Sequence, residues 1–302
     1  MRIFVSGGSG YIGSVVTETL AIYGHDITGL LRSPSKAGVL EQAGARPLLG
    51  DLNDPDTYSS ALGQNDVLIH MAYQHQAETV TVDEAALQTF LDSAKLNSQT
   101  RMVIYTSGCH VLGDTGGERV AEDGSTDRPG ANVTWRPEHE QRVLEAANER
   151  LTTAVIRPGM VYGGRGGLIP KMFESAKKDG TVTVFGDGEN HWSMVHVEDL
   201  ANLYRLIVEQ EAGGIFHGVD GNPVKARHVA EAASEVAGAG GAINNIPLDE
   251  GRKKLGKLAD ALCLDQLCVA RRSLQLGWQP ERKSFLENVI ATYREWKDKP
   301  KP

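Results

Sequence analysis

Residues 2–13 read Arg-Ile-Phe-Val-Ser-Gly-Gly-Ser-Gly-Tyr-Ile-Gly, and this stretch decides the fold. Its apolar start predicts a buried strand, and the apolar spacing of residues 12–23 predicts a helix. Three glycines spaced by three allow a tight turn, a close approach to a pyrophosphate, and packing of the helix on the strand. The partial positive charge of the helix N-terminus would face the phosphates. The residues predicted to bind a dinucleotide here are Gly7, Gly10, Tyr11, Ile12 and Gly13.

The bulk composition narrows the class of protein. The 302 residues are 40% hydrophobic and 23% charged, which suffices for one large domain or two modest ones with a real core. A net charge of -8 without long charged runs indicates neither nucleic acid nor a membrane as a partner. No apolar stretch reaches the ~18 residues that a membrane span needs. Because no signal-peptide pattern is present, we expect a cytoplasmic protein that acts on a small-molecule substrate.

The cysteines predict no special chemistry. Cys109, Cys263 and Cys268 cannot all pair, and Cys263 and Cys268 lack the further Cys or His spacing of a zinc site. We therefore expect three reduced thiols and no metal site.

Strand-like and helix-like segments alternate through the first two-thirds of the chain. Such alternation predicts an α/β fold with a doubly wound parallel sheet of the Rossmann type, covered by helices on both faces. The expected strands are residues 2–6, 26–31, 46–49, 67–71, 102–106 and 153–157. The expected helices between them are residues 12–23, 35–43, 56–62, 83–97 and 136–149.

The composition of the chain changes after Arg157-Pro158-Gly159, where glycine clusters appear. We expect a dinucleotide-binding domain over 1–162 and a smaller C-terminal substrate-binding region over 163–302. About 190–222 of the second region should return to the sheet. The segments expected there are helices near 197–210 and 225–237, a strand near 215–219, and a glycine-rich lid at 163–167 that carries Arg165.

The end of the second strand predicts the type of nucleotide. An acidic residue there would bind the ribose 2′-OH of NAD, but this chain has Arg32 and Ser33 instead, which suit the 2′-phosphate of NADP. NADP is therefore the preferred cofactor and NAD the alternative, although Arg32 could equally be an exposed surface residue. Asp51 and Leu52 follow the third strand, where a carboxylate can accept from the adenine amino group or simply form a turn.

Several short segments share one recognisable pattern. They are Gly7 to Gly13, Asp51-Leu52, His70-Met71-Ala72, Tyr105-Thr106-Ser107-Gly108 with Val111-Leu112-Gly113, Arg157-Pro158-Gly159-Met160-Val161-Tyr162-Gly163, and Trp192 to Leu200. Together they resemble the short-chain dehydrogenase/reductase superfamily, closest to the extended or atypical branch with NAD-dependent epimerases and dehydratases. The resemblance implies that the cofactor is lined by Met71, Ala72, Thr106, Arg136, Pro158, Gly159 and Met160.

The chain departs from the chemistry of that superfamily, which uses a Ser/Thr and a Tyr-x-x-x-Lys. Its Ser/Thr position falls on Gly108, with Ser107 adjacent, and its Tyr and Lys positions fall on Asn132 and Arg136. Residues 113–150 contain no Tyr and no Lys at all. The usual proton donor is therefore not in its usual place.

Other residues could replace it. The Ser107 hydroxyl could polarise a carbonyl, or be satisfied by backbone at a strand end. His110 could shuttle protons because histidine titrates near neutrality, or be a loop residue; with Cys109 it takes the place of the dehydratases' acid/base pair. Arg136 supplies charge but cannot act as an acid. The predicted catalytic residues are Ser107, His110, Arg136 and Tyr73. His75, Trp135 and Tyr162 are further candidates for substrate contact or packing.

Three functions stay open. The first is an NAD(P)-dependent oxidoreductase that transfers hydride to or from a carbonyl or hydroxyl substrate. The second is a sugar-nucleotide epimerase or dehydratase, and the third is a non-catalytic dinucleotide sensor. A homodimer is also expected, because the helices at 83–97 and 136–149 occupy the places where relatives form a four-helix interface. The helix at 83–97 carries an apolar stripe that could serve this interface, namely Ala86, Leu87, Phe90, Leu91 and Ala94. The sheet, however, also needs one such stripe to cover it.

Overall fold

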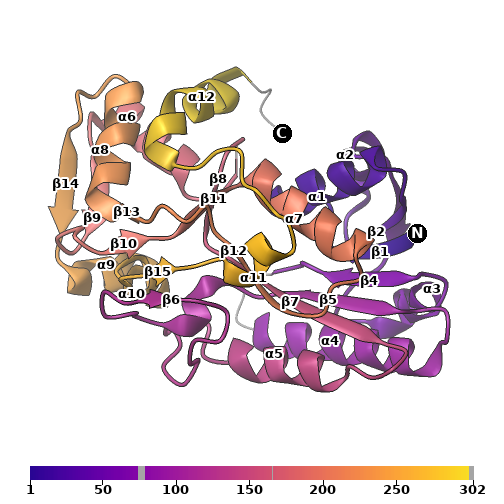
Figure 1. The fold of residues 1–302 in the computed structure, drawn as a ribbon. Helices are drawn as coiled ribbons and strands as arrows, with labels where there is room; N and C mark the ends of the chain where they lie inside the picture. The colour runs from indigo at the N-terminus through magenta and orange to yellow at the C-terminus, as the bar shows by residue number, and fades with distance from the viewer. Residues whose placement is uncertain (74–78, 165, 299–302) are drawn as a thin grey trace.

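A seven-stranded parallel sheet forms the centre of the computed structural model, which describes residues 1–73, 79–164 and 166–298 (Figure 1). In spatial order its strands are β12 (Gly214–Gly218), β7 (Thr152–Pro158), β5 (Met102–Thr106), β4 (Val67–His70), β1 (Arg2–Ser6), β2 (Asp26–Leu31) and β3 (Ala45–Leu49). The chain runs outward from β1 in one direction and from β4 in the other. The strand order therefore reverses between β1 and β4, which is where such sheets bind ligands.

The central strands are apolar because both faces of the sheet are covered. Ile3, Phe4 and Val5 of β1 are fully buried, and so is nearly every residue of β4. Only the edge strand β3 has mostly exposed or half-buried side chains. This burial explains why the strands read as continuous apolar runs rather than as an alternation.

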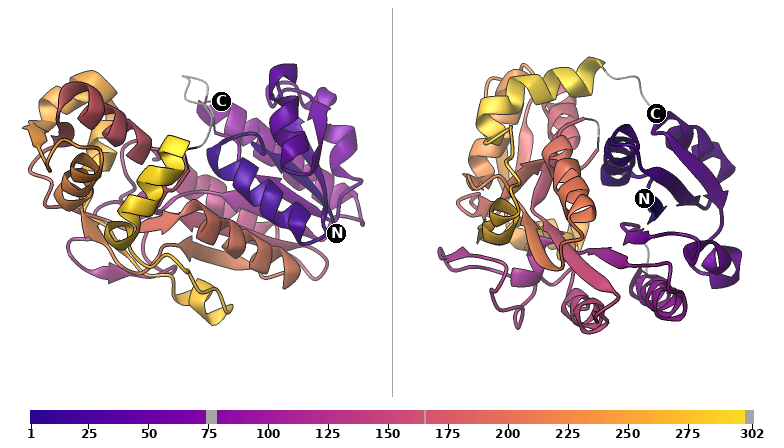
Figure 2. Two further views of the ribbon diagram at one scale, coloured as in Figure 1. Left: turned by 90° about the horizontal axis from the view of Figure 1, so that it is seen from above. Right: turned by 45° about the vertical axis from the view of Figure 1, so that its right-hand side comes forward.

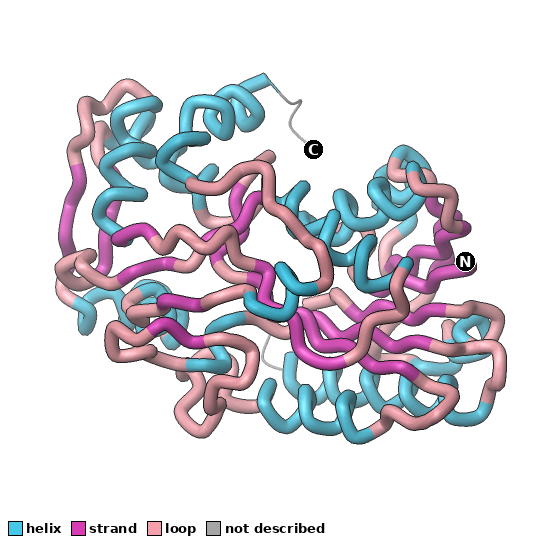
Figure 3. Tube along the Cα trace, viewed as in Figure 1, coloured by secondary structure: helices cyan, strands magenta, loops and turns pink. Residues whose placement is uncertain are grey.

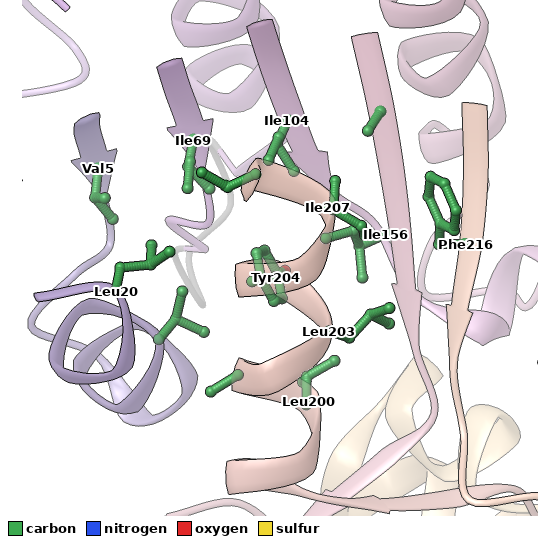
Figure 4. Packing of buried hydrophobic residues seen from close by; sticks show 14 of the residues in the cluster. Val5, Leu20, Ile69, Ile104, Ile156, Leu200, Leu203, Tyr204, Ile207 and Phe216 are labelled. Atoms are coloured by element: carbon green, nitrogen blue, oxygen red, sulfur yellow. The ribbon is translucent and has the colours of Figure 1, made fainter. Parts of the chain in front are cut away.

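Helices form a layer on each face of the sheet (Figure 2). Figure 4 shows Leu203, Tyr204 and Ile207 lying over Ile104 and Ile156 of the sheet, with the three-and-four spacing of one helix face. The helices of the two layers are α1 (Tyr11–Ile22), α2 (Ala37–Gln42) and α7 (Val197–Glu209) on one face, and α3 (Ser59–Leu62), α4 (Thr79–Leu96) and α5 (Arg136–Glu145) on the other.

The C-terminal part of the chain builds a second, smaller body beside the sheet (Figure 3). Its own core joins Phe173, Val182, Trp192, Val229 and Phe285. Its elements, with the short strands and helices that link it to the sheet, are β6 (Arg119–Val120), β8 (Met160–Tyr162), α6 (Ile169–Asp179), β9 (Val182–Phe185), β10 (His191–Trp192), β11 (Met194–His196), β13 (Val224–Lys225), α8 (Ala226–Val236), β14 (Ile243–Ile246), α9 (Leu248–Leu255), α10 (Lys257–Leu262), β15 (Leu267–Cys268), α11 (Arg271–Gln275) and α12 (Phe285–Asp298).

The strand expected near 215–219 is β12, which pairs in parallel with β7 at the edge of the sheet. Four expected helices differ from the structure. The one expected over 83–97 is already helical at Thr79. The segments 35–43 and 56–62 each begin as a 3₁₀ turn after a proline, at Pro34–Lys36 and Pro55–Thr57. The helix expected over 136–149 ends at Glu145, because the Asn148 side chain accepts from the backbone N–H of Arg150 (3.0 Å) and forms a competing turn.

The apolar stripe of α4 packs within the chain. Ala86, Leu87, Phe90 and Ala94 are fully buried against the sheet and α3. The stripe is therefore used by the sheet, and the homodimer stays a prediction. No helix within the described residues, α4 included, combines the length and apolarity needed to cross a membrane.

The glycine turn gives a stability prediction. A Cβ on Gly13 would lie 2.0 Å from the carbonyl oxygen of Gly7, whereas a Cβ on Gly38 of α2 would meet nothing within 4 Å. We expect Gly13→Ala to destabilise the fold by at least about 1–3 kcal/mol through overpacking. The matched control Gly38→Ala should be neutral or stabilising by about 0.5–1 kcal/mol. Urea unfolding midpoints measure both, and equal shifts would contradict the packing role of Gly13.

Candidate active site

The glycine turn holds the ends of β1 and β4 against each other. Gly7 has a φ of +78°, and a Cβ there would lie 2.6 Å from the backbone nitrogen of Ala72. The Met71 N–H donates to the Ser6 carbonyl (3.1 Å) just before the turn. The structure therefore brings the predicted residues Gly7, Met71 and Ala72 together at the point where the strand order reverses.

The N-terminus of α1 is open toward this crevice. Ser14 makes the first backbone bond of the helix, from its N–H to the Gly10 carbonyl (2.9 Å). Within the described residues, the N–H groups of Tyr11, Ile12 and Gly13 have no backbone acceptor. Gly10 carries no side chain that could cap them. A bare helix N-terminus after a glycine turn fits a pyrophosphate, so these residues fit a dinucleotide.

A cavity of about 160 Å³ lies beside this turn, between the ends of β1, β2 and β3. Gly7, Arg32, Asp51, Leu52 and Ala72 are among the residues that line it. The sequence placed all five at the cofactor, and the structure gathers them around one space of a size that suits part of a nucleotide.

The polar residues at this cavity differ in how far their side chains are already engaged by bonds within the chain. Asp51 already accepts from the backbone N–H (3.0 Å) and the side-chain amide (2.9 Å) of Asn53, so it forms the turn that was its alternative interpretation. These bonds and the charge of Arg32 lower the pKa of Asp51. Arg32 is exposed at the rim. Ser33 does not line the cavity, and its hydroxyl bonds to that of Ser35 (2.8 Å).

At the other end of the crevice, the loop after β5 lies against the end of β7. The Ser107 N–H donates to the Ile156 carbonyl (2.8 Å), and the Cys109 thiol donates to the Arg157 carbonyl (3.3 Å). A Cβ on Gly159 would lie 2.2 Å from the Ser193 carbonyl oxygen, which explains glycine there. The predicted catalytic loop is therefore beside the predicted nicotinamide segment Pro158, Gly159 and Met160.

The Ser107 hydroxyl oxygen is buried and has no hydrogen-bond partner within the described chain. The alternative, a strand-end hydroxyl satisfied by backbone, is therefore not what the structure shows. A buried hydroxyl without a partner is costly. Its presence beside a ligand crevice is explained if a ligand atom completes its bonding.

His110 is neutral at physiological pH. Burial lowers the pKa of its imidazole to about 4, and the charge of Arg136 adds to the shift. The expectation that His110 titrates near neutrality is therefore wrong. The side-chain amide of Asn132 donates to Nδ1 (3.3 Å), which leaves the imidazole proton on Nε2. His110 thus presents an N–H donor rather than a charge.

Asn132 stands where the superfamily has its tyrosine, and from the sequence we inferred only that the tyrosine is missing. In the structure its amide oxygen is buried without a partner within the described residues. Asn132 therefore fixes the tautomer of His110 and keeps an acceptor unused. No spacing in the sequence indicates this contact, because it depends on a loop folding back over the β5 end.

Arg136 begins α5 and is buried. Its Nη1 donates to the Thr106 carbonyl (2.6 Å), and its guanidinium lies 4.7 Å from the ring centre of Trp135 and 5.4 Å from that of Tyr73. The structure thus brings together three predicted residues, Thr106, Arg136 and Tyr73. The Trp135 ring, like that of Tyr73, packs against the guanidinium of Arg136.

A buried network below Arg136 was not found from the sequence. Asp83 accepts from the Tyr105 hydroxyl (2.8 Å) and from His139 Nδ1 (2.8 Å), and it lies 3.3 Å from His70 Nε2. Burial alone would raise the pKa of Asp83, but the bonds from the two histidines and the charge of Arg136 hold it well below its ordinary value. These residues come from distant parts of the chain, so no motif reveals them.

The remaining candidate residues from the sequence are Tyr162, His75 and Arg165. Tyr162 is fully buried in the second core, with its ring edge-on to Phe285, so it serves packing. His75 and Arg165 lie outside the described residues.

Comparison with known proteins agrees with this geometry. The model of the NAD dependent epimerase/dehydratase family matches residues 3–217, which is most of the chain. The chain belongs to this family. It is therefore an enzyme that uses a nicotinamide dinucleotide, and the non-catalytic sensor that the sequence left open is set aside.

Two relatives cover most of the chain. An uncharacterised protein of Schizosaccharomyces pombe is 31% identical over 308 residues, which is 96% of this chain and 99% of the relative. A ketoreductase of Stigmatella aurantiaca, which acts on 4-hydroxy-2-methyl-3-oxo-4-farnesyl-3,4-dihydroquinoline-1-oxide, is 28% identical over 83% of this chain and 78% of its own.

Solved structures share the fold. UDP-glucose 4-epimerase of Thermus thermophilus in complex with NAD has a TM-score of 0.81 at 22% identity, covering 98% of this chain and 99% of that one. Human epimerase family protein SDR39U1 with NADPH has a TM-score of 0.75 at 19% identity, covering 97% and 99%. At such identities the likeness shows the fold alone.

The charge state of His110 can be measured directly. We expect its imidazole to titrate with a pKa of about 4, below the 6.5 of a free histidine. The unfolded chain then takes up its proton first, so the contribution to stability is complete above about pH 6.5 and is lost as the pH falls toward 4. Arg136→Gln should raise the pKa while leaving it below 6.5, because burial remains. Imidazole chemical shifts against pH give both values, and a midpoint near 6.5 in the unmodified protein would refute the assignment.

Proposed function

We propose that the chain is an NADP-dependent oxidoreductase that transfers hydride between the nicotinamide and a carbonyl/hydroxyl pair, without the usual Tyr and Lys. One observation carries this proposal. The unpartnered Ser107 hydroxyl stands on the loop that carries the neutral His110, and this loop lies against the end of β7: the Ser107 N–H donates to the Ile156 carbonyl (2.8 Å), and a Cβ on Gly108 would lie 3.8 Å from the Pro158 carbonyl oxygen.

Each residue has a distinct task in this proposal. The bound nicotinamide supplies or accepts the hydride. Ser107 donates a hydrogen bond to the substrate carbonyl oxygen. His110 donates a second hydrogen bond from Nε2, since a neutral imidazole can polarise a carbonyl without carrying charge. The alkoxide that hydride addition leaves takes its proton from the Ser107 hydroxyl, which regains one from solvent water; in the oxidation the proton travels the opposite way. Arg136 stabilises the negative charge that develops on the oxygen, and it never gives up its own proton.

The preference for NADP rests on the cavity between β1, β2 and β3. Arg32 is its only cation among the described lining residues, and no carboxylate stands at the end of β2. A guanidinium there can form charge-assisted bonds to a 2′-phosphate. A human protein of the same fold was solved with NADPH, which supports the proposal.

A reductase is favoured over an epimerase or dehydratase. A ketoreductase is among the relatives at 28% identity, and a UDP-glucose 4-epimerase of Corynebacterium glutamicum is among them at 24%. A cofactor held through an exposed Arg32 also suits an enzyme that exchanges its cofactor in every turnover. An epimerase that oxidises and re-reduces its substrate would instead retain the cofactor.

The cofactor preference yields a prediction. We expect Arg32→Ala to weaken NADPH binding by about 10–100-fold, the range for losing a hydrogen bond to a charged group. NADH affinity should stay unchanged, because NADH has no 2′-phosphate. Fluorescence titration with each nucleotide measures both constants.

The matched control is Arg46→Ala, which removes another exposed arginine, one that pairs with Asp26 (2.7 Å) outside the cavity. It should change neither affinity. Equal losses of NADPH and NADH binding in Arg32→Ala would rule out the phosphate role.

The proposed donor gives a second prediction. His110→Ala should lower turnover by ~10²–10⁴-fold while leaving NADPH affinity alone. Turnover is followed as NADPH consumption with the most active member of a panel of ketones and 3-oxo acids. His228→Ala, at an exposed position on α8, is the control and should be as active as the unmodified enzyme. Full activity in His110→Ala would remove His110 from the mechanism.

A further inference from the structure

An apolar cavity of about 180 Å³ lies in the smaller body, away from the dinucleotide crevice. Its walls come from α6, β9, β10, the start of α8, and the α9–α10 pair. Nine of its twelve lining residues are apolar, and Met172, Val184, Trp192 and Leu262 are among them. We call it the α6–β9 cavity.

Two of the polar side chains around this cavity are already hydrogen-bonded to backbone carbonyls. The Trp192 indole N–H donates to the Leu262 carbonyl (3.0 Å), so the ring offers only its apolar surface. The Ser175 hydroxyl donates to the Thr181 carbonyl (2.9 Å). A cavity of about 150 Å³ lined by apolar side chains stays dry and binds small apolar molecules. The α6–β9 cavity has the size and the lining for such an occupant.

The surroundings do not suit a nucleotide diphosphate. Among the described lining residues Lys171 is the only cation, and it is exposed. The neighbouring Lys225 and Arg227 are both engaged by Glu189, at 2.7 and 2.6 Å. A diphosphate needs cations or free N–H groups. Of these three cations, two are held by a carboxylate and the third, Lys171, is a single exposed charge.

Two walls of the cavity continue into the candidate active site. Trp192 precedes Ser193, whose carbonyl accepts from the Met160 N–H (2.8 Å) in the proposed nicotinamide segment. Leu262 leads to Gln266, whose side-chain amide donates to the carbonyl of Cys109 (2.9 Å), the neighbour of His110. The cavity is therefore built by the same segments that support the proposed reaction centre.

We propose that the α6–β9 cavity holds an aliphatic chain of the carbonyl substrate, so that the substrate class is an alkyl ketone rather than a nucleotide sugar. This inference rests on the proposed oxidoreductase function. Leu255 lines the cavity and is 41% exposed at the end of α9, so it stands at the solvent mouth of the cavity. A half-exposed leucine at the mouth extends the apolar surface from the cavity toward the solvent.

The test uses the full-length protein and the neutral naphthyl ketone Prodan as a fluorescent probe. We expect Prodan to bind one saturable site and to be displaced by pentan-2-one, heptan-2-one and nonan-2-one. Affinity should rise about fourfold for each methylene that becomes buried. UDP and UDP-glucose at the same concentrations should displace nothing.

Two variants locate the site. Leu255→Asp should weaken nonan-2-one binding by about tenfold, because a charged group at the mouth replaces apolar contact. Leu258→Asp changes an equally exposed leucine (44%) that does not line the cavity, and it should leave the affinity unchanged. Both substitutions lie on exposed surface, and NADPH titration of each variant checks that the cofactor crevice is intact.

Several outcomes would overturn this inference. They are displacement of Prodan by UDP, no dependence on ketone chain length, and equal losses in the two variants. The NADPH titration separates this failure from that of the proposed function. If NADPH binds but nonan-2-one does not, only the aliphatic site is wrong. If nonan-2-one binds but NADPH does not, the oxidoreductase assignment has failed.

Discussion

The absence of a side chain at Gly7 and Gly13, in the turn that leads from β1 into α1, is the constraint on which the rest of the structure depends. A single Cβ at Gly7 would collide with the backbone of Ala72, and one at Gly13 would collide with the Gly7 carbonyl. These two contacts bring the turn against β4 and seat α1 on the sheet. The bare helix N-terminus then opens onto the point where the strand order reverses.

One buried cation contributes to the electrostatics of the crevice, together with burial and with the histidines around Asp83. Arg136 replaces a lysine of the superfamily pattern, and it is held by aromatic rings and by the Thr106 carbonyl. Its charge helps to keep Asp83 ionised and His110 neutral. A permanent cation next to a neutral N–H donor can stabilise an oxyanion, although neither group is the tyrosine that relatives use.

The smaller body is tied to the sheet through backbone contacts at the active site. The Ser193 carbonyl accepts from Met160, and Gln266 binds the loop of Cys109. The walls of the apolar cavity are thus positioned by the same hydrogen bonds that position the loops around the proposed nicotinamide segment. The proposed substrate cavity and the proposed reaction centre are therefore joined by short stretches of the same chain.

The sequence by itself determined the parallel sheet, its strand positions and the glycine turn. These depend on local properties, namely apolar runs and residues without a Cβ, which a chain carries before it folds. It also placed Arg32, Asp51 and Ser107 near the cofactor, because the carboxyl ends of parallel strands share one edge of the sheet. Only the tertiary structure decided that His110 is neutral, that Asn132 sets its tautomer, and that Asp83 lies between two histidines. Charge states depend on burial and on neighbours that are far away in the sequence, and no local pattern contains them.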